Sequence, residues 1–286
     1  MLENAAAFAK ISSLNFDQEP PSETVTCVSV QTIEKVLQEQ YGIILRPLEI
    51  QTPEGLAACL SADLVGQEEA TALIGKTLSA LSLRKKQVTD RPLGVLLFTG
   101  PTGTGKTYAA RLLAKCLFPN QPDAFVRFSM NEYKEHYDLS RLTGAAPGLI
   151  GHEQAGVLYQ FVQSHRQGVI LLDEIEKAAH EIQDFFLQIF DEGEGRDSRG
   201  RLANFRQQLF VLTANICAEL KDDHVQDNAQ TDTLLEQVFS PELLGRIDQV
   251  VEFRALDYGD YSVLFERLLK KLIADCGFPQ VNISVR

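Results

Sequence analysis

The sequence has no apolar run long enough to cross a bilayer. Its longest apolar stretches, Val95–Phe98 and Val169–Leu172, are far shorter than the roughly 20 residues that a membrane-spanning helix needs. The N-terminal segment, MLENAAAFAK, has no basic part followed by an apolar part, so we expect no secretion signal. These two absences predict a chain without a membrane partner.

Cysteine and histidine are few, and neither type is clustered. The five cysteines are odd in number and never spaced C-x-x-C, which argues against a disulfide framework or a zinc site and suits a reducing cytoplasm. The five histidines contain no H-E-x-x-H pattern and are interpreted as surface or packing residues. We therefore expect a cytoplasmic location. The residues concerned are Cys27, Cys59, Cys116, Cys217, Cys276, His136, His152, His165, His180 and His224.

Positive charge is also scarce. Lysine and arginine total 27 against 39 aspartates and glutamates, which gives a formal net charge of -12. Such a surface repels a phosphate backbone unless its basic residues cluster. The densest cluster, Arg84-Lys85-Lys86, lies at the end of a helical pattern, where cations complement the helix dipole. We expect no nucleic-acid partner.

The central part of the chain alternates short apolar runs with helical patterns. Strands that are apolar throughout belong in a parallel sheet covered on both faces. The alternation therefore predicts an α/β fold in which a parallel five-stranded sheet lies between two layers of helices. The predicted strands are Val95–Thr99, Phe125–Ser129, Val169–Asp173, Leu209–Thr213 and Val250–Phe253, and the predicted helices are Lys106–Leu117, Ala155–Arg166, Ala178–Phe190 and Thr231–Val238.

Helical patterns also flank this central part. Residues 1–28 are expected to form an irregular arm after a short helix, and Ser29 to Tyr41 are expected to form a helix that Ser29 caps. A loop is expected next, as far as Asp63–Gln67, followed by a long amphipathic helix. The final pattern, Asp257–Cys276, predicts one helix of a second, mostly helical unit.

A glycine-rich turn directly follows the first predicted strand. GPTGTGKT, Gly100–Thr107, matches G-x-x-x-x-G-K-[ST] at every fixed position. In such a loop the backbone N–H groups surround a phosphate, Lys106 bridges the β- and γ-phosphates, and the Thr107 hydroxyl ligates Mg²⁺. A glycine-rich turn without a ligand is the alternative, which the motif and its context disfavour. The expected nucleotide contacts are Pro101, Thr102, Gly103, Thr104, Gly105, Lys106 and Thr107.

Two acidic residues follow the third predicted strand, in GVILLDEIEKA. Ligands of parallel sheets bind at the carboxyl ends of the strands, where Asp173 and Glu174 emerge. We expect Asp173 to hold Mg²⁺ through its water shell and Glu174 to orient and polarise the attacking water. The alternative is that these residues only begin a helix. Asn215, in VLTAN after the next strand, is expected to bond the water or the γ-phosphate.

Two further segments predict contacts with other chains. Arg246, in SPELLGRID, is an arginine finger if it reaches the γ-phosphate of a neighbouring subunit, and an ordinary ion-pair residue if it does not. In TGAAPGLIGHEQAG, Gly148 and Gly151 flank Leu149-Ile150, so two aliphatic side chains are carried by a backbone that the glycines make flexible. This segment is either a mobile finger that contacts a partner or a buried loop that closes a core.

As a group, these residues resemble the AAA+ ATPases, and specifically the second ATPase module of the Clp/ClpB-type unfoldases and disaggregases. The likeness rests on LVGQEEA (Leu64–Ala70), GPTGTGKT, VILLDEIEKA, GEGRDSRGRLANFRQQLFVLTAN and FSPELLGRID, which occur in the family's order. The resemblance implies a P-loop NTPase fold and ATP hydrolysis with Mg²⁺. It also implies adenine contacts from Val65 and Gly66, and a homo-oligomeric ring, usually a hexamer, in which each neighbour's Arg246 completes the site.

The resemblance also implies a polypeptide client. Gly148, Leu149, Ile150 and Gly151 would lie in a pore loop that grips it, and the glycines would act as hinges. The family normally has an aromatic residue, usually tyrosine, at the position of Leu149. Leucine offers less contact, so a nucleotide-dependent assembly scaffold or switch without threading is the alternative function.

The likeness also divides the chain into domains. Residues 1–60 would be an N-terminal arm and connector, residues 61–254 the large ATPase domain, and residues 255–286 the beginning of a small helical lid. The family's lid carries a further arginine that senses the γ-phosphate, which we expect beyond Arg286. We therefore expect weak nucleotide affinity and little hydrolysis from this chain alone.

Overall fold

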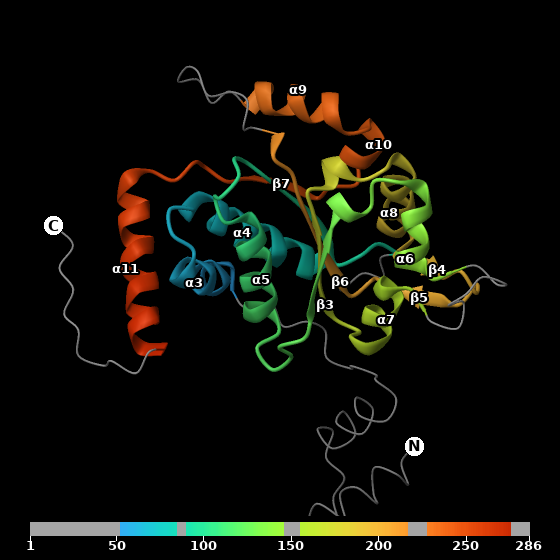
Figure 1. Cartoon of the computed structure of the whole chain (residues 1–286), viewed down its shortest axis with the longest axis horizontal. Coiled ribbons are helices and arrows are strands. Elements are labelled where there is room, and N and C mark those ends of the chain that lie inside the picture. The colour runs from blue at the N-terminus through green and yellow to red at the C-terminus, as the bar shows by residue number, and fades with distance from the viewer. Residues whose placement is uncertain (1–51, 85–89, 146–154, 217–227, 276–286) are drawn as a thin grey trace, which may run out of the picture. The chain divides into compact units, whose positions relative to one another are not determined.

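The structure is a computed structural model that describes residues 52–84, 90–145, 155–216 and 228–275. The chain forms two compact units, Met1–Glu49 and Ile50–Arg286. The first unit, which includes the helix predicted from Ser29 to Tyr41, lies outside the described residues. Figure 1 shows the second unit, a sheet with helices on both of its faces.

The sheet has five parallel strands in the order β2-β3-β6-β1-β7. This arrangement confirms the predicted fold class, and each strand agrees with its predicted run to within one residue at either end. Because all five strands are parallel, their carboxyl ends lie along one edge of the sheet. The strands are β1 (Gly94–Thr99), β2 (Phe125–Ser129), β3 (Gly168–Asp173), β6 (Gln208–Thr213) and β7 (Gln249–Glu252).

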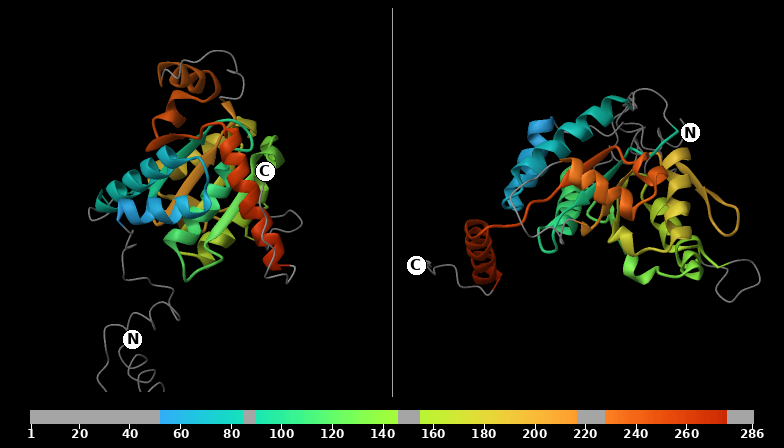
Figure 2. Two further views of the ribbon diagram at one scale, coloured as in Figure 1. Left: turned by 90° about the vertical axis from the view of Figure 1, so that its left-hand side faces the viewer. Right: turned by 90° about the horizontal axis from the view of Figure 1, so that it is seen from above.

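Helices cover the two faces of the sheet, and the views in Figures 1 and 2 agree on the arrangement. One face carries α3 (Pro53–Asp63), α4 (Glu68–Arg84) and α5 (Lys106–Leu117). The opposite face carries α7 (Val157–Ser164) and α8 (His180–Glu192), with the short α6 (Leu139–Thr143) beside them. The predicted three-layer order of helices, sheet and helices is therefore confirmed.

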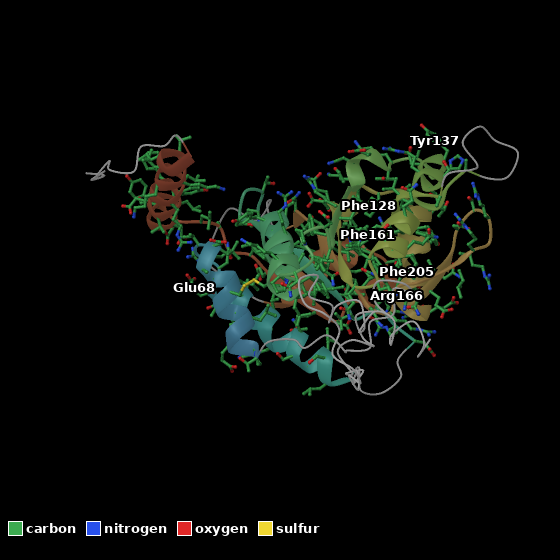
Figure 3. All side chains as sticks on the ribbon, turned by 90° about the horizontal axis from the view of Figure 1, so that it is seen from below. Glu68, Phe128, Tyr137, Phe161, Arg166 and Phe205 are labelled. Carbon is green, nitrogen blue, oxygen red and sulfur yellow. A yellow bond between two sulfur atoms is a disulfide. The ribbon has the colours of Figure 1, made fainter. Side chains whose placement is uncertain are left out.

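A large apolar core cluster lies between the sheet and α7–α8. Every residue of β1, β3 and β6 is buried, as expected for central strands covered on both faces. Phe128, Phe161 and Phe205, labelled in Figure 3, belong to one buried cluster with side chains of α8. Burying each such ring stabilises the fold by roughly 1.5–3 kcal/mol. This core fixes the sheet edge on which the polar residues described below are mounted.

Several described elements were not predicted from the sequence, among them α3, a two-stranded hairpin and the short helix α6. The described part of the loop expected before Asp63 is a helix, α3, which begins at Pro53 because the Thr52 hydroxyl accepts a hydrogen bond from the Gly55 N–H group at 3.2 Å. A two-stranded antiparallel hairpin, β4 (Glu194–Arg196) and β5 (Leu202–Asn204), was not predicted. Strands of three residues are too short to show an apolar alternation.

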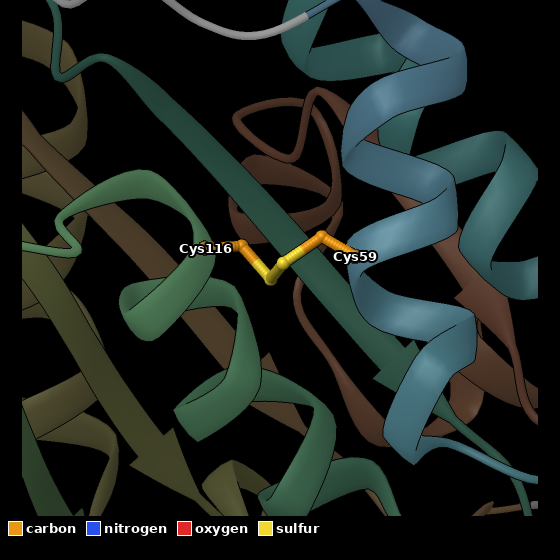
Figure 4. Close-up of a disulfide and its surroundings, with 2 residues drawn as sticks. All are labelled: Cys59 and Cys116. Carbon is orange, nitrogen blue, oxygen red and sulfur yellow. A yellow bond between two sulfur atoms is a disulfide. The ribbon is translucent and has the colours of Figure 1, made fainter.

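A disulfide joins Cys59 of α3 to Cys116 of α5 (Figure 4). The sequence argument against disulfides is therefore wrong for this pair. That argument relied on spacing along the chain, and these cysteines are 57 residues apart in sequence. Their Cα atoms are 6.2 Å apart because α3 packs against α5.

The described C-terminal part contains α9 (Asn228–Val238), α10 (Pro241–Leu244) and α11 (Tyr258–Asp275). Helix α11 agrees with the predicted helix to within one residue at each end. It carries exposed Tyr261, Phe265 and Leu268, and Arg267 donates a hydrogen bond to the Ala62 carbonyl at 2.8 Å. Among the described helices, none combines the length and the apolar character that a bilayer crossing requires.

Candidate nucleotide site

The glycine-rich loop forms the turn between β1 and α5. Gly100 has a φ of 130°, and a Cβ atom there would lie 2.2 Å from the Phe253 carbonyl oxygen, so no larger residue fits. Gly103 has a φ of 85°, and nothing lies within 4 Å of the position its Cβ would take. The loop is thus pinned to the end of β7 on one side and open on the other. An open loop with backbone N–H groups at a helix N-terminus is suited to bind an anion.

Lys106 is the first residue of α5 and is almost fully buried. Its Nζ donates hydrogen bonds to the carbonyl oxygens of Gly100 and Pro101, at 2.7 and 2.8 Å. The ammonium group is therefore held against the loop itself. It can exchange these two carbonyls for phosphate oxygens without leaving the site.

Gln67 ties the loop to the segment that follows β7, the strand next to β1. Its Nε2 donates to the carbonyl oxygens of Thr104, at 3.2 Å, and of Arg254, at 2.9 Å, and its Oε1 accepts from the Arg254 N–H group at 3.1 Å. The predicted base contacts, Val65 and Gly66, directly precede it and are half-buried and buried, respectively. The predictions did not include Gln67, because a glutamine between a loop and a helix carries no chemical signature of its own.

Asp173 is the last residue of β3 and is buried. Its Oδ1 accepts hydrogen bonds from the hydroxyls of Thr107, at 3.0 Å, and Thr213, at 2.5 Å. Its Oδ2 forms an ion pair with Arg127 at 2.6 Å. The structure therefore brings the predicted pair Thr107 and Asp173 together. It adds Arg127, which lies inside β2, and Thr213, which is the last residue of β6; the sequence predictions included neither.

Glu174 follows with an unusual backbone conformation. Among the described residues it is the one non-glycine residue with positive φ, at 60°. Its N–H group donates to the Thr213 hydroxyl at 2.9 Å, which holds the turn in place. The side-chain amide of Asn215 donates to Oε1 at 3.1 Å, and that of Asn131 donates to Oε2. A strained conformation fixed by three polar side chains orients the carboxylate, and such strain clusters at functional sites.

Asn131 was not predicted. It lies in a 3-10 turn (Met130–Glu132) directly after β2, and β2 pairs with β3 in a register that sets Ser129 beside Asp173. A polar residue just past the end of the neighbouring strand was a usable signal, because parallel strands end at the same edge. Asn215, by contrast, lies where predicted. Its backbone N–H group also donates to Oε1 of Glu176 at 3.3 Å, and burial raises the pKa of Glu176 above its ordinary value.

Arg246 is in different surroundings. It follows α10, its side chain is 38% exposed, and it forms an ion pair with Asp191 of α8. The hydrogen bond that Arg246 donates to the Asp191 carboxylate raises the pKa of Arg246, so the guanidinium stays charged. Arg91 donates to the Arg246 carbonyl oxygen at 2.7 Å. Within the described residues, the structure gives Asp191 as its ion-pair partner and does not join Arg246 to the Asp173–Glu174 group.

The remaining predicted residues, Gly148, Leu149, Ile150 and Gly151, lie outside the described residues. The groups that are described fit a magnesium nucleotide. The loop and Lys106 offer N–H donors to phosphates, and the Thr107 hydroxyl and the Asp173 carboxylate offer the oxygen ligands that Mg²⁺ prefers, directly or through water. Glu174 stands next to Asp173 with its carboxylate already oriented.

Comparison with known proteins agrees with this geometry. The AAA domain family (Cdc48 subfamily) matches residues 91–250. The chaperone protein ClpB of Mycoplasmoides gallisepticum is 38% identical over 267 residues, which cover 91% of this chain and 36% of that protein. The ATP-dependent Clp protease ATP-binding subunit ClpE of Bacillus subtilis is 36% identical over 264 residues, which cover 88% of this chain and 37% of that protein. The chain thus spans just over a third of the length of these curated relatives.

Proposed function

The chain belongs to the AAA domain family as a Clp/ClpB-type AAA+ ATPase, and on this premise we propose that its Gly100–Thr107 site binds and hydrolyses ATP with Mg²⁺. The observation that carries the proposal is the meeting of Lys106, Thr107, Asp173 and Glu174 at one edge of the sheet. Ligands of parallel sheets bind at the carboxyl ends of the strands, and an ammonium, a hydroxyl and two carboxylates at that edge suit a magnesium nucleotide.

In this mechanism the loop N–H groups and Lys106 hold the β- and γ-phosphates. Thr107 and Asp173 hold Mg²⁺, which when bound neutralises charge that develops on the phosphates. Glu174 accepts a proton from the attacking water, and Asn215 fixes the orientation of the Glu174 carboxylate. The hydroxyl of Thr213 keeps Asp173 and the backbone of Glu174 in register.

We further propose that each site is completed by Arg246 of a neighbouring chain in a hexameric ring. Exposure of Arg246 supports this role, because a guanidinium at the surface can reach another subunit. The proposed client is a polypeptide, gripped by the Gly148–Gly151 loop, and neither nucleic acid nor membrane is a proposed partner. Residues 61–254 would form the large ATPase domain, with a connector before it and the beginning of a lid after it. We propose a cytoplasmic location from the likeness to ClpB and ClpE, because the Cys59–Cys116 disulfide removes the cysteine argument for it.

A scaffold or switch that assembles with ATP but does not thread its partner is the second candidate, and Leu149 in place of an aromatic residue favours it. A fluorescent unfolded polypeptide separates the two candidates. ATP-dependent translocation supports the remodeller, whereas nucleotide-gated binding without movement supports the scaffold.

The nucleotide site itself is tested with a fluorescent ATP analogue and the Lys106→Ala variant. We expect affinity to fall by about 10- to 100-fold, the effect of losing a charge-assisted hydrogen bond to phosphate. Lys115→Ala is the matched control, because Lys115 is an exposed lysine in the last turn of the same helix. Equal loss of affinity in the two variants would contradict the site.

A further inference from the structure

Arg127 lies in β2, which is the edge strand of the sheet beside β3. One of its guanidinium nitrogens is 2.6 Å from Oδ2 of Asp173. The Arg127 side chain is 47% exposed, whereas that of Asp173 is 7% exposed. A half-exposed cation therefore neutralises a buried carboxylate from the open side of the sheet.

Both oxygens of Asp173 are engaged. Oδ1 accepts from the hydroxyls of Thr107 and Thr213, and Oδ2 receives Arg127 together with a longer contact of 3.3 Å from Thr107. The two threonine hydroxyls can rotate when a cation approaches Asp173, but they carry no charge. Arg127 is therefore the group in this cluster that competes by charge with any cation that approaches Asp173.

Such competition follows from the cost of a buried charge. A buried carboxylate without a partner is strongly unfavourable, so the folded chain needs a counter-ion at Asp173 before any ligand arrives. A guanidinium suits this task because it stays charged and is weakly hydrated. Its position on an edge strand lets the long side chain withdraw towards solvent, which the nearly buried Lys106 cannot do.

We propose that Arg127 is a positioning residue that occupies the cation place on Asp173 in the nucleotide-free chain and must be displaced when Mg²⁺ binds with nucleotide. Arg127 thereby sets the Mg²⁺ concentration that the site requires. It also keeps the Asp173 carboxylate oriented towards the phosphate loop in the absence of metal. This inference rests on the proposed nucleotide site and adds a residue that controls its metal requirement.

The test measures binding of mant-ADP to the full chain across a Mg²⁺ titration, with EDTA as the zero point. In Arg127→Met, we expect the half-saturating Mg²⁺ concentration to fall by about two- to fivefold, the scale of a partly exposed ion pair. Affinity for mant-ADP in EDTA should stay within about twofold, since Arg127 does not hold the phosphates in this proposal. Arg127→Lys, which keeps the charge but loses the planar fork, should lie between the two.

Arg111→Met is the matched control. Arg111 stands over the ring of Phe125, at the beginning of the same strand, and its loss changes the net charge equally without touching Asp173. An unchanged or increased Mg²⁺ requirement in Arg127→Met would overturn the inference, as would an equal decrease in Arg111→Met. Loss of mant-ADP affinity in EDTA would also overturn it, because Arg127 would then be a phosphate ligand.

Failure of the underlying site has a different signature. If the unsubstituted chain binds no mant-ADP at any Mg²⁺ concentration, the proposed function is wrong and this inference falls with it. If the unsubstituted chain binds normally and only the Mg²⁺ dependence fails to change, the inference alone is wrong. Thermal unfolding of Arg127→Met and Arg127→Lys identifies any variant that has lost its fold.

Discussion

The Asp173–Glu174 region and the Arg246 region are built in opposite ways. Asp173 and Glu174 receive hydrogen bonds or ion pairs from β2, the turn after it, α5, and β6 with the residues after it, and Glu174 has a strained backbone. Arg246 is 38% exposed and forms an ion pair with Asp191, which is itself 44% exposed. One region is fixed by many polar contacts around the buried Asp173, and the other is held by a contact at the surface.

This difference indicates which groups of the proposed site a single chain can hold in position without a neighbour. Groups that hold phosphate and orient water need fixed positions, because misplacement by 1 Å weakens catalysis greatly. A residue that serves a neighbour must stay accessible, and a surface ion pair is easily exchanged for another anion. The contrast therefore favours a site of which each chain supplies the buried part.

The largest expected effect on ATP turnover concerns the proposal that two neighbouring chains contribute to each site. Where an arginine finger acts, it contributes about 10³–10⁵-fold to the rate, so we expect Arg246→Ala to abolish most ATP turnover in the assembled state. Glu174→Gln should be nearly inactive for a different reason, the loss of the base. A mixture of the two variants should regain ATPase activity, because one supplies an intact Glu174 and the other an intact Arg246.

The mixture is checked by steady-state ATPase at a fixed total concentration, against each variant alone. Lys271→Ala, on α11, serves as a control for simple loss of a positive charge. If Arg246 acts within its own chain, the mixture should stay as inactive as its components. That result would contradict the proposal that Arg246 acts on the site of a neighbouring chain.

Glu174→Gln by itself should slow hydrolysis by about 10²–10⁴-fold, the usual contribution of a positioned base. Nucleotide affinity should be unchanged, because the carboxylate orients water rather than phosphate. Single-turnover hydrolysis and binding of a fluorescent ATP analogue measure the two quantities separately. Glu181→Gln, an exposed glutamate on α8, is the control. Unchanged turnover in Glu174→Gln would reject Glu174 as the base.

Much of the fixed region could be predicted from the sequence. Completely apolar runs identified β1, β3 and β6, because central strands of a parallel sheet are buried on both faces. The loop motif and the Asp173-Glu174 pair after β3 then predicted that Thr107 and Asp173 would meet, and the structure places them 3.0 Å apart. The strands and the proximity of these two side chains could be predicted because each depended on local sequence and on one rule about where parallel strands end, whereas the roles of the two residues stay predictions.

The missed groups differ in the signal they carry. Asn131 and Thr213 stand just past the end of β2 and at the end of β6, where the rule about parallel strands could have found them. Arg127 lies inside β2, and its contact with Asp173 depends on the register of β2 beside β3. The Cys59–Cys116 pair depends on the packing of α3 against α5. Spacing along the chain cannot reveal contacts that tertiary packing creates. Gln67 was missed for the same reason, since its partners Thr104 and Arg254 are distant in sequence.

The third effect concerns the stability of the phosphate-loop side. A cross-link over 57 residues restricts the unfolded chain, so we expect Cys59→Ser to lower the free energy of unfolding by about 2–4 kcal/mol. In a unit of this size, that change lowers the Tm by about 5–10 °C. Scanning calorimetry measures it. Reductant should lower the Tm of the unsubstituted chain similarly and leave Cys59→Ser unchanged. A Tm insensitive to reductant would show that this bond does not hold α3 to α5.

A smaller effect is expected from Asn131, which tests whether the orientation of Glu174 matters. In Asn131→Ala, Oε2 of Glu174 loses its amide donor while Asn215 still holds Oε1. We expect the rate of ATP turnover to fall by about tenfold or less, because Asn131 acts on the reaction only through Glu174. Nucleotide affinity should be unaltered. Asn131→Asp should be worse than Asn131→Ala, since like charges repel. Equal activity in both variants would contradict a role for Asn131 in orienting Glu174.

The smallest effect tests the cost of building a buried polar site. Burial raises the pKa of Glu176 above its ordinary value of 4.5, and its Oε2 has no hydrogen-bond partner among the described residues. Above the folded-state pKa the carboxylate is charged in both states and burial destabilises the fold. As the pH falls through that pKa, the folded state gains a proton first and the cost disappears.

Glu176→Gln should therefore raise the free energy of unfolding at pH 7.5, by less than about 1 kcal/mol, and this gain should vanish towards pH 4. Denaturant titrations at both pH values measure the gain, with Glu181→Gln as the control. A gain independent of pH would mean that packing, and not charge, is what the substitution relieves.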